Sequence, residues 1–174
     1  MSHSLFPALV KRFAALESQL NTLDAATGDG DHGATMLKGL RAAADAPDNP
    51  GQAFRKAAGG ASGSLFGLVI AALDTALKGE ASLDDALARA ATRIGQMGGA
   101  KAGDKTMLDA LIPASRSDRP ALAARRGADA TREMAAKRGR AKYVEGAGVG
   151  HVDAGATSIV ELLTAFVEHE ECTG

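Results

Sequence analysis

The sequence predicts an all-helical fold in which about seven or eight antiparallel helices form an up-and-down bundle or barrel. Apolar residues recur every three or four positions in most segments, which is the spacing of one helical face. No segment shows the strict alternation of apolar and polar residues that is typical of a half-buried strand. The chain has no Trp, one Tyr and five Phe, and a core with so few aromatic residues favours closely packed helices over a β-sandwich.

The length and composition limit the domain organisation and the classes of partner. A chain of 174 residues has the usual size of one domain, so we expect a single domain over residues 1–174. A formal net charge of −1 provides no basic surface for nucleic acid or for a membrane. The only cysteine, Cys172, excludes an internal disulfide and favours a cytoplasmic location. We expect neither an export signal nor a segment with the roughly 18 apolar residues of a membrane span.

The first half of the chain predicts four helices. An apolar face recurs over residues 5–20, through Leu5, Leu9, Phe13, Leu16 and Leu20. A loop rich in Asp and Gly follows over 21–33, and helix formers resume over 34–44 until a Pro-Asp-Asn-Pro-Gly turn. A short helix is expected over 52–58 and a longer one over 65–77, with the glycine cluster 59–64 at the entrance of the latter.

The second half of the chain repeats this alternation of glycine clusters and helices. Ser82, followed by Asp85 three positions later, resembles a capping box and predicts a helix that ends near Gln96. The glycine cluster 98–104 precedes a helix over 105–114, which Asp104 can cap. The Ala- and Arg-rich segment 121–137 predicts another helix, and a last helix over 156–168 follows the glycine-rich segment 138–155.

The first candidate site is the acidic sequence LDAATGDGDHG, residues 23–33, which contains Asp24, Asp29 and Asp31. Three carboxylates this close repel one another unless a cation neutralises them, and the glycines allow the backbone to turn tightly. Mg²⁺ prefers carboxylates together with water and phosphate oxygens, so the three aspartates are predicted metal ligands. An ordinary surface turn is the alternative. A calcium loop of the EF-hand type is excluded, because its twelfth position would be Leu40 instead of Glu.

Two further glycine clusters precede helices and favour a phosphate-bearing ligand. Backbone N–H groups at the start of a helix attract anions, and the small residues of 59–64 let a phosphate approach. That loop lacks the Lys of a Walker motif, and close helix packing is the alternative reading of its glycines. In the sequence GDKTMLD, Thr106 offers a hydroxyl, and Met107 suits contact with a flat ring or, equally, an ordinary core.

The last glycine-rich segment carries basic residues and an aspartate. Arg140 or Lys142 could stabilise charge on a transferred phosphoryl group, although a solvated basic loop is the alternative. Asp153 could cap the last helix or bind a ribose or adenine. Among the histidines, His32 and His151 lie inside glycine-rich motifs and are candidates for function, whereas His3 and His169 are expected on the surface.

Four motifs, LDAATGDGDHG, GGASGSLFG, AGDKTMLDALIP and GRAKYVEGAGVGHVDAGATS, together resemble the L subunit, or nucleotide-binding L domain, of dihydroxyacetone (glycerone) kinases. The resemblance runs from about Leu23 to Ser158. It implies an antiparallel eight-helix barrel with the nucleotide site at one end, and a cytoplasmic phosphotransferase of glycerol metabolism. Asp24, Asp29 and Asp31 match the family's aspartate pattern, which implies two Mg²⁺ ions that bridge the phosphates of ATP or ADP.

The same resemblance implies the remaining site residues. Phosphates would contact Gly60, Ala61 and Ser62, and Arg140 would reach them as the catalytic residue. The other implied nucleotide-site residues are His32, Thr35, Gly103, Thr106, Met107, Asp153 and Gly155. Ala154 stands where the family usually has Pro, so the loop beside the adenine is expected to be less rigid.

The resemblance also implies a division of labour between two proteins. Family K subunits bind the ketose covalently through a histidine, so this chain would be active only with a K-type partner, docked at the end with the aspartates and Arg140. The motifs do not identify the phosphoryl donor. It could be ATP that exchanges as an ordinary substrate, or a tightly bound ADP that a phosphotransferase-system protein rephosphorylates. The motifs also do not identify the ketose.

Two other functions stay open at this point. One is the nucleotide domain of a fatty-acid-kinase-like system, which normally continues into further domains, whereas this chain ends soon after its last motif. The other is a non-catalytic nucleotide-binding regulator, although the three aspartates argue against the loss of metal binding.

Overall fold

The computed structural model describes residues 5–174, and this part of the chain contains eight α-helices and no strand. The helices are α1 (Leu5–Ala25), α2 (His32–Ala44), α3 (Pro50–Ala58), α4 (Gly60–Leu77), α5 (Leu83–Gly98), α6 (Leu108–Ala114), α7 (Pro120–Ala130) and α8 (Ala154–Thr173). His3 lies outside the described residues. His169 is half-buried within α8 and not fully exposed as expected, because that helix continues past the predicted end at 168.

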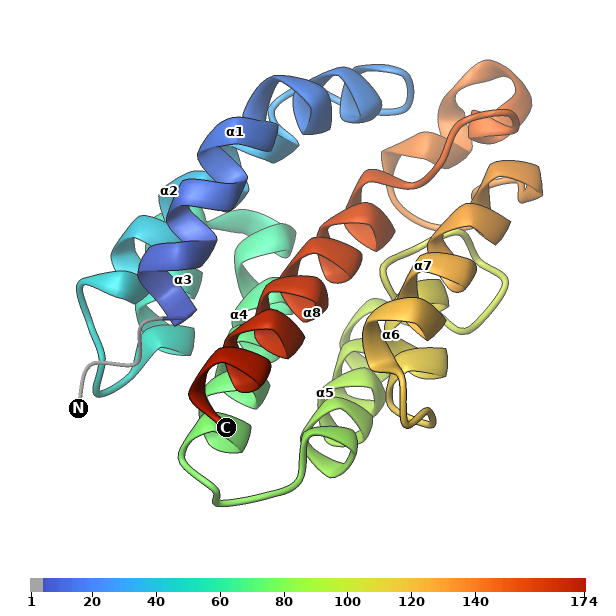
Figure 1. Ribbon diagram of the computed structural model, residues 1–174. Coiled ribbons are helices and arrows are strands. Elements are labelled where there is room, and N and C mark those ends of the chain that lie inside the picture. Colours follow the sequence, from blue (N-terminus) through green and yellow to red (C-terminus); the bar gives the residue numbers. More distant parts are fainter. Residues whose placement is uncertain (1–4) are drawn as a thin grey trace.

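The eight helices form a closed ring in chain order (Figure 1). Each helix packs against the next one along the chain, and α8 packs against α1 to close the ring. The connections are short except for the one before α8, and short connections make successive helices antiparallel. The predicted all-helical, up-and-down barrel is therefore confirmed.

The antiparallel arrangement places four connections at one end of the barrel, and these are the four that carry the glycine-rich motifs. They follow the odd-numbered helices and comprise residues 26–31, 59, 99–107 and 131–153. The other three connections and both ends of the described chain lie at the opposite end (Figure 1). Motifs that are more than 100 residues apart in sequence therefore meet, since every second turn of the ring returns to the same end.

The core fills the barrel with aliphatic side chains and a few Phe residues. Phe13 and Phe54 are fully buried together with Leu, Ile and Met from several helices. Small residues allow this close packing: a Cβ atom at Gly39 would lie 2.5 Å from the Phe54 ring, and one at Gly51 would lie 2.8 Å from the Gly67 carbonyl oxygen. The scarcity of aromatic residues is thus matched by helices that approach closely through glycine and alanine.

The closure between the first and last helices includes an ion-pair bridge. Arg12 on α1 donates from Nη1 to Glu161 at 3.0 Å and from Nη2 to Glu168 at 2.5 Å, and both acidic residues lie on α8. Such partly exposed pairs contribute modestly to stability, so the ring is closed mainly by the apolar contacts between α1 and α8.

Several helices begin or end at other residues than predicted. The acidic loop is shorter than expected, because α1 continues through Asp24 to Ala25 and α2 begins at His32. Helix α4 begins at Gly60 and not at residue 65, so the glycine cluster forms its first turn. Ser82 caps α5 as expected and accepts the N–H of Asp85.

Two other predictions about helices are wrong. Helix α6 begins at Leu108 and not at 105, because Lys105 has a φ of 61° that a helix cannot contain, and Asp104 does not cap it. Helix α7 ends at Ala130, whereas a helix was expected to 137. Residues 131–153 instead form three short 3₁₀ turns, in keeping with their glycines at positive φ.

Within the described residues, α4 is the one helix that is long and apolar enough to cross a membrane by length and composition alone. No such segment was expected from the sequence, because many residues of α4 are Gly, Ala and Ser. Core helices pass the same test, and α4 packs in the ring against α3 and α5. The finding is therefore weak evidence for a membrane span.

Candidate functional site

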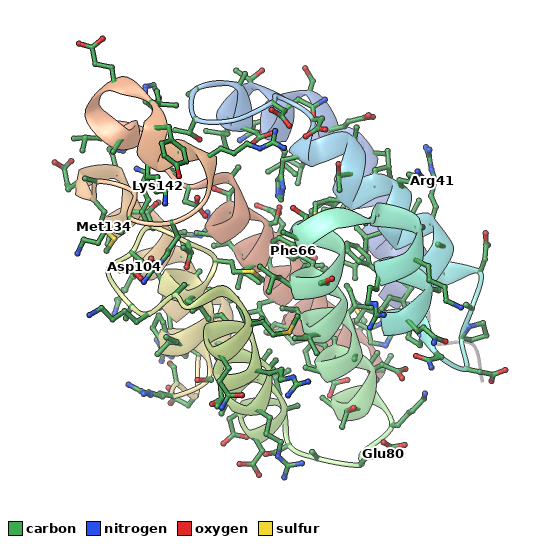
Figure 2. The ribbon with its side chains drawn as sticks, turned by 180° about the vertical axis from the view of Figure 1, so that it is seen from behind. Arg41, Phe66, Glu80, Asp104, Met134 and Lys142 are labelled. Carbon is green, nitrogen blue, oxygen red and sulfur yellow. The ribbon has the colours of Figure 1, made fainter. Side chains whose placement is uncertain are left out.

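A pocket of about 600 Å³ lies at the end of the barrel where the four motif loops meet. Its wall contains all three predicted metal ligands and every residue predicted to contact a nucleotide except Gly103. Phe66 on α4 lies near this end, whereas Glu80, in the connection after α4, lies at the opposite end of the barrel (Figure 2). The fold thus brings the predicted site residues together on one surface.

Asp24 organises the acidic loop from the last turn of α1. Its Oδ2 atom accepts the backbone N–H groups of Gly30, Asp31 and His32 at 3.0, 3.0 and 3.1 Å. Its Oδ1 atom faces Gly28, where an added Cβ would lie only 2.7 Å from that oxygen. One oxygen therefore fixes the loop around the start of α2, and the glycine keeps the space beside the other oxygen free.

The other two aspartates of the acidic loop are exposed on the pocket side. Asp31 precedes α2, but its side chain does not cap that helix by a hydrogen bond. Asp29 forms an ion pair with Arg140 from the connection before α8. The arginine therefore approaches the acidic loop from across the pocket.

The carboxylates suit Mg²⁺ in type, because Mg²⁺ takes oxygen ligands, and all three line one pocket. Among residues 5–174, no group of three His, Cys, Asp or Glu side chains converges on one ligand position in this arrangement. Asp29 faces Arg140 instead. Binding of a cation by all three aspartates would require Asp29 to exchange that guanidinium for the metal.

The glycine cluster at the start of α4 forms one side of the pocket. Gly59 and Gly60 have φ values of 68° and 60°, and a Cβ at either would meet nothing within 4 Å. These glycines are thus required by backbone conformation and not by crowding. No side chain caps the first turn of α4, so the N–H groups of Gly60, Ala61 and Ser62 are available for an anion at the pocket wall.

Asp109 holds the loop before α6 in shape. Its two carboxylate oxygens accept the N–H groups of Gly103 at 2.6 Å and Thr106 at 2.9 Å. Thr106 itself accepts the N–H of Leu108 at 3.2 Å, so its hydroxyl supports the helix start as well as facing the pocket. Gly103 does not line the pocket; its φ of 90° makes it a turn residue behind the wall.

The loop before α8 meets Met107 at the side of the pocket predicted to hold a base. A Cβ at Gly155 would lie 3.6 Å from the Cβ of Met107, so the two motifs are in contact. Asp153 caps α8 by accepting the N–H of Ala156 at 2.8 Å, which confirms one of its two predicted roles. Burial raises the pKa of its carboxyl to about 6, while that N–H and the charge of Lys105 oppose the shift.

The raised pKa predicts a pH-dependent effect of Asp153→Asn. The protonated carboxyl is favoured in the folded state, so its stabilising contribution is complete below about pH 4 and is lost as the pH rises through 6. Asn stays neutral and can still accept the Ala156 N–H. We expect the variant to be more stable than the wild type by about 2 kcal/mol at pH 8 and equal to it at pH 4.

Thermal unfolding at several pH values measures this difference. Asp129→Asn, at an exposed position on α7, is the matched control and should show no such dependence. Equal stabilities of Asp153→Asn and the wild type at pH 8 would show that the carboxylate is not desolvated in the folded protein.

His32 is buried beneath the acidic loop and links α2 to α8. Its Nε2 atom lies 2.8 Å from the hydroxyl of Ser158, and its ring packs against Phe66 at 5.6 Å between centroids. Burial lowers the pKa of His32, while the charges of Asp24 and Asp31 oppose that shift. A neutral imidazole at this position supports the pocket floor, and its ring lines the pocket as predicted.

Some residues of the pocket wall were assigned no role from the sequence, and two candidate residues lie outside the wall. Lys105, Arg138 and Phe66 line the pocket. All three lie within or beside quoted motifs, but nothing local shows which way their side chains point. By contrast, His151 does not line the pocket, and Lys142 lies over the ring of Tyr143 at 4.7 Å.

Fold and site together define an all-helical barrel domain whose polar pocket is formed by four loops at one end. The family model of the DAK2 domain matches residues 26–168, which include three of the four motifs in full and the first motif from Ala26 onward. The chain belongs to the DAK2 domain family, and the predicted relation to the L-type domain of dihydroxyacetone kinases is confirmed.

Named relatives agree with this assignment. L-erythrulose 1-kinase of Mycolicibacterium smegmatis is 36% identical over 185 residues, which cover 88% of this chain and 32% of that protein. Triokinase/FMN cyclase of Homo sapiens is 32% identical over 184 residues, with the same coverage of 88% and 32%. The chain therefore spans about a third of the length of these kinases.

A solved structure has the same fold. The dihydroxyacetone kinase from C. freundii, crystallised in complex with AMP-PNP and Mg²⁺, matches with a TM-score of 0.76 and 26% sequence identity. The match covers 96% of this chain and 33% of that chain. The native form of that enzyme matches with a TM-score of 0.72 and 27% identity.

Proposed function

We propose that this chain is the Mg²⁺-dependent nucleotide-binding domain of a dihydroxyacetone-type kinase, spanning residues 1–174, that delivers a phosphoryl group to a small ketose. The observation that carries the proposal is the convergence of the acidic loop, the first turn of α4 and Arg140 on one pocket. Each would supply what a nucleotide polyphosphate requires: oxygen ligands for a metal, backbone N–H donors and a cation. The similarity to a structure crystallised with AMP-PNP and Mg²⁺ supports the choice of ligand.

Each part of the pocket would have a distinct task. Asp24, Asp29 and Asp31 would hold Mg²⁺, two ions in the family pattern, which supplies charge neutralisation for the phosphates. The N–H groups of Gly60, Ala61 and Ser62 would bind phosphate oxygens. Met107 and the segment from Asp153 to Gly155 would border the base, while His32 and Thr35 would line the phosphate side.

Arg140 would be the catalytic residue. Its guanidinium reaches the acidic loop across the pocket, which is the region where a terminal phosphate would lie between metal ligands and the α4 loop. Phosphoryl transfer needs positioning and neutralisation of charge more than it needs a general base. An exposed arginine such as Arg140 can contact the transferred group while the acceptor approaches from outside the barrel.

The acceptor would be held by a separate K-type partner. The named kinases are about three times as long as this chain, and their names refer to erythrulose and triose acceptors. A ketose of three or four carbons is therefore the substrate class we propose. The phosphoryl donor would be exchanging ATP or a bound ADP that a phosphotransferase-system protein rephosphorylates.

The test combines the chain with a K-type subunit, Mg²⁺, ATP and dihydroxyacetone or erythrulose. The wild type should phosphorylate the ketose, and Asp31→Ala should reduce the rate by about 100-fold or more, because a free carboxylate in the metal loop is lost. Removal of Mg²⁺ with a chelator should have at least the same effect. Ketose phosphate formed over time is the measurement.

Asp48→Ala is the matched control, because Asp48 is exposed in the turn before α3 at the opposite end of the barrel. It should leave the rate unchanged. If Asp31→Ala keeps the wild-type rate, the metal assignment is wrong. If the wild type binds MgADP but transfers no phosphoryl group with any K-type subunit, the chain is a nucleotide-binding regulator instead.

A further inference from the structure

The connection between α7 and α8 forms a strap, residues 131–153, that lies across the pocket end of the barrel. It carries Arg138 and Arg140, which both line the pocket. The strap folds back on itself, because the N–H of Gly150 donates to the Arg132 carbonyl at 2.7 Å and the N–H of Ala136 donates to the Ala147 carbonyl at 2.8 Å. Its two ends therefore lie side by side above the loop before α6.

Lys105 of that loop sits beneath both ends of the strap. The residue is only 3% exposed. Its ammonium donates to the carbonyl oxygens of Thr131, Gly148 and His151 at 2.7, 2.9 and 2.5 Å. An ammonium group has three N–H donors, so all of them are used on the strap, one at its beginning and two near its end.

The backbone of Lys105 is held in an unusual conformation that serves this contact. Its φ of 61° lies in the left-handed region, which is costly for a residue with a long side chain. The strap leaves space for this side chain at Gly148, which has no Cβ. A Cβ at Gly148 would lie 3.2 Å from the Cε of Lys105 and 2.7 Å from the side chain of Thr27. Both partners thus depend on a special backbone geometry at the point of contact.

The residue before Lys105 attaches the middle of the strap. The carbonyl of Asp104 accepts the N–H of Lys137 at 3.1 Å, and its buried carboxylate lies 3.6 Å from the Nε of Arg138. Together, Asp104 and Lys105 contact the strap on both sides of the segment that carries Arg140. A buried ammonium is stable only when hydrogen bonds replace its hydration, and here the strap carbonyls replace it.

We propose that Lys105 is a positioning residue whose ammonium clamps the two ends of the strap, so that the strap presents Arg140 to the pocket. Lys105 lines the pocket, which would suggest direct contact with the ligand, but its three N–H donors are already used by carbonyl groups. It therefore acts through Arg140. The part of this inference that concerns ligand binding rests on the function proposed above, whereas the clamp itself does not.

Limited proteolysis with trypsin, without nucleotide, tests the clamp. The strap contains five cleavage positions, at Arg132, Lys137, Arg138, Arg140 and Lys142. In Lys105→Asn we expect strap cleavage to be about tenfold faster than in the wild type, because the carbonyls lose their donor and the strap opens locally. Asn is chosen because it tolerates a positive φ, so the backbone of the loop is retained.

Lys101→Asn, on the same loop but exposed, is the matched control and should be cleaved like the wild type. Gly148→Ala provides a second route, since it disturbs the same contact from the strap side with Lys105 intact, and it should also accelerate cleavage. Equal cleavage rates for Lys105→Asn and the wild type would overturn the proposal.

NMR of the wild-type protein tests the clamp without any substitution. The ammonium of Lys105 should give a persistent ¹⁵N–¹H signal in NMR, because its protons are buried and hydrogen-bonded. Absence of any such signal at pH 6 and low temperature would contradict the clamp.

A double-variant cycle on MgADP affinity tests whether Lys105 acts through Arg140. We expect Lys105→Asn to weaken MgADP binding about tenfold in the wild-type background and less than about twofold in the Arg140→Gln background. Calorimetric titration gives both values. Equal losses in the two backgrounds would show that Lys105 affects the ligand independently of Arg140. If the wild type itself does not bind MgADP, the proposed function fails, while the proteolysis result still decides the clamp.

Discussion

Replacement of Asp24 with Ala is expected to abolish measurable MgADP binding and to lower phosphoryl transfer with a K-type partner by about 1000-fold or more. The effect is expected to be large because Asp24 would have two roles in the proposed function. One oxygen fixes the backbone of Gly30, Asp31 and His32, and the other would bind the metal. The variant therefore loses a ligand and, at the same time, the loop that positions Asp29 and Asp31.

Asp24→Asn separates the two tasks. The amide oxygen can still accept the three N–H groups, but the negative charge is lost. We expect the acidic loop to keep its hydrogen-exchange protection in the Asn variant and to lose it in the Ala variant, with MgADP binding weakened about 100-fold or more in both. Calorimetric titration and hydrogen exchange measure the two effects.

Asp118→Asn is the control for a change of charge, because Asp118 is exposed in the turn between α6 and α7 at the far end of the barrel. MgADP binding near the wild-type level in Asp24→Ala would disprove the metal assignment. Equal loop protection in the Ala and Asn variants would instead show that the three hydrogen bonds do not hold the loop.

Gly33→Ala is expected to destabilise the protein by about 3 kcal/mol. A Cβ at this position would lie 2.2 Å from the carbonyl oxygen of Glu17 and 2.9 Å from its carbonyl carbon. Both atoms belong to the backbone of α1, so no side chain can rotate away to make space. The start of α2 would have to move away from α1, which also displaces His32 from Ser158.

Urea-induced unfolding measures the loss of stability. Gly98→Ala is the matched control, because its Cβ would meet only the Cβ of Ala100 at 4.0 Å. That substitution should leave stability unchanged or raise it slightly, as Ala favours a helix over Gly. A loss below about 1 kcal/mol for Gly33→Ala would show that α1 and α2 can separate at little cost.

The acidic loop and the strap meet in an ion pair. Asp29 and Arg140 are 111 residues apart in sequence and contact each other across the pocket. If the proposed function is correct, the Arg140 guanidinium occupies the place beside Asp29 that a metal ion takes when the nucleotide binds. The guanidinium would then contact the phosphate instead of Asp29. Changes in the acidic loop or in the strap are therefore expected to affect the same ligand from opposite sides.

Local patterns were sufficient to predict the helices and the types of ligand. Apolar spacing identified the helical face from Leu5 to Leu20, and Ser82 marked the start of α5, because both signals act within a few residues. The aspartates of the acidic loop indicated a cation from their mutual repulsion alone. The end of α7 was predicted seven residues too late, because Ala and Arg favour a helix locally and the strap contacts that override them come from Lys105 and Asp104.

The sequence by itself determined that this chain is helical, which of its loops are polar and glycine-rich, and the family to which it belongs. Only the tertiary structure decided that Lys105 faces the strap, that Gly103 lies behind the pocket wall and that His151 and Lys142 are not part of this wall. The physical reason is that the direction of a loop side chain depends on φ values and on partners far along the chain. Neither is encoded in the spacing of neighbouring residues.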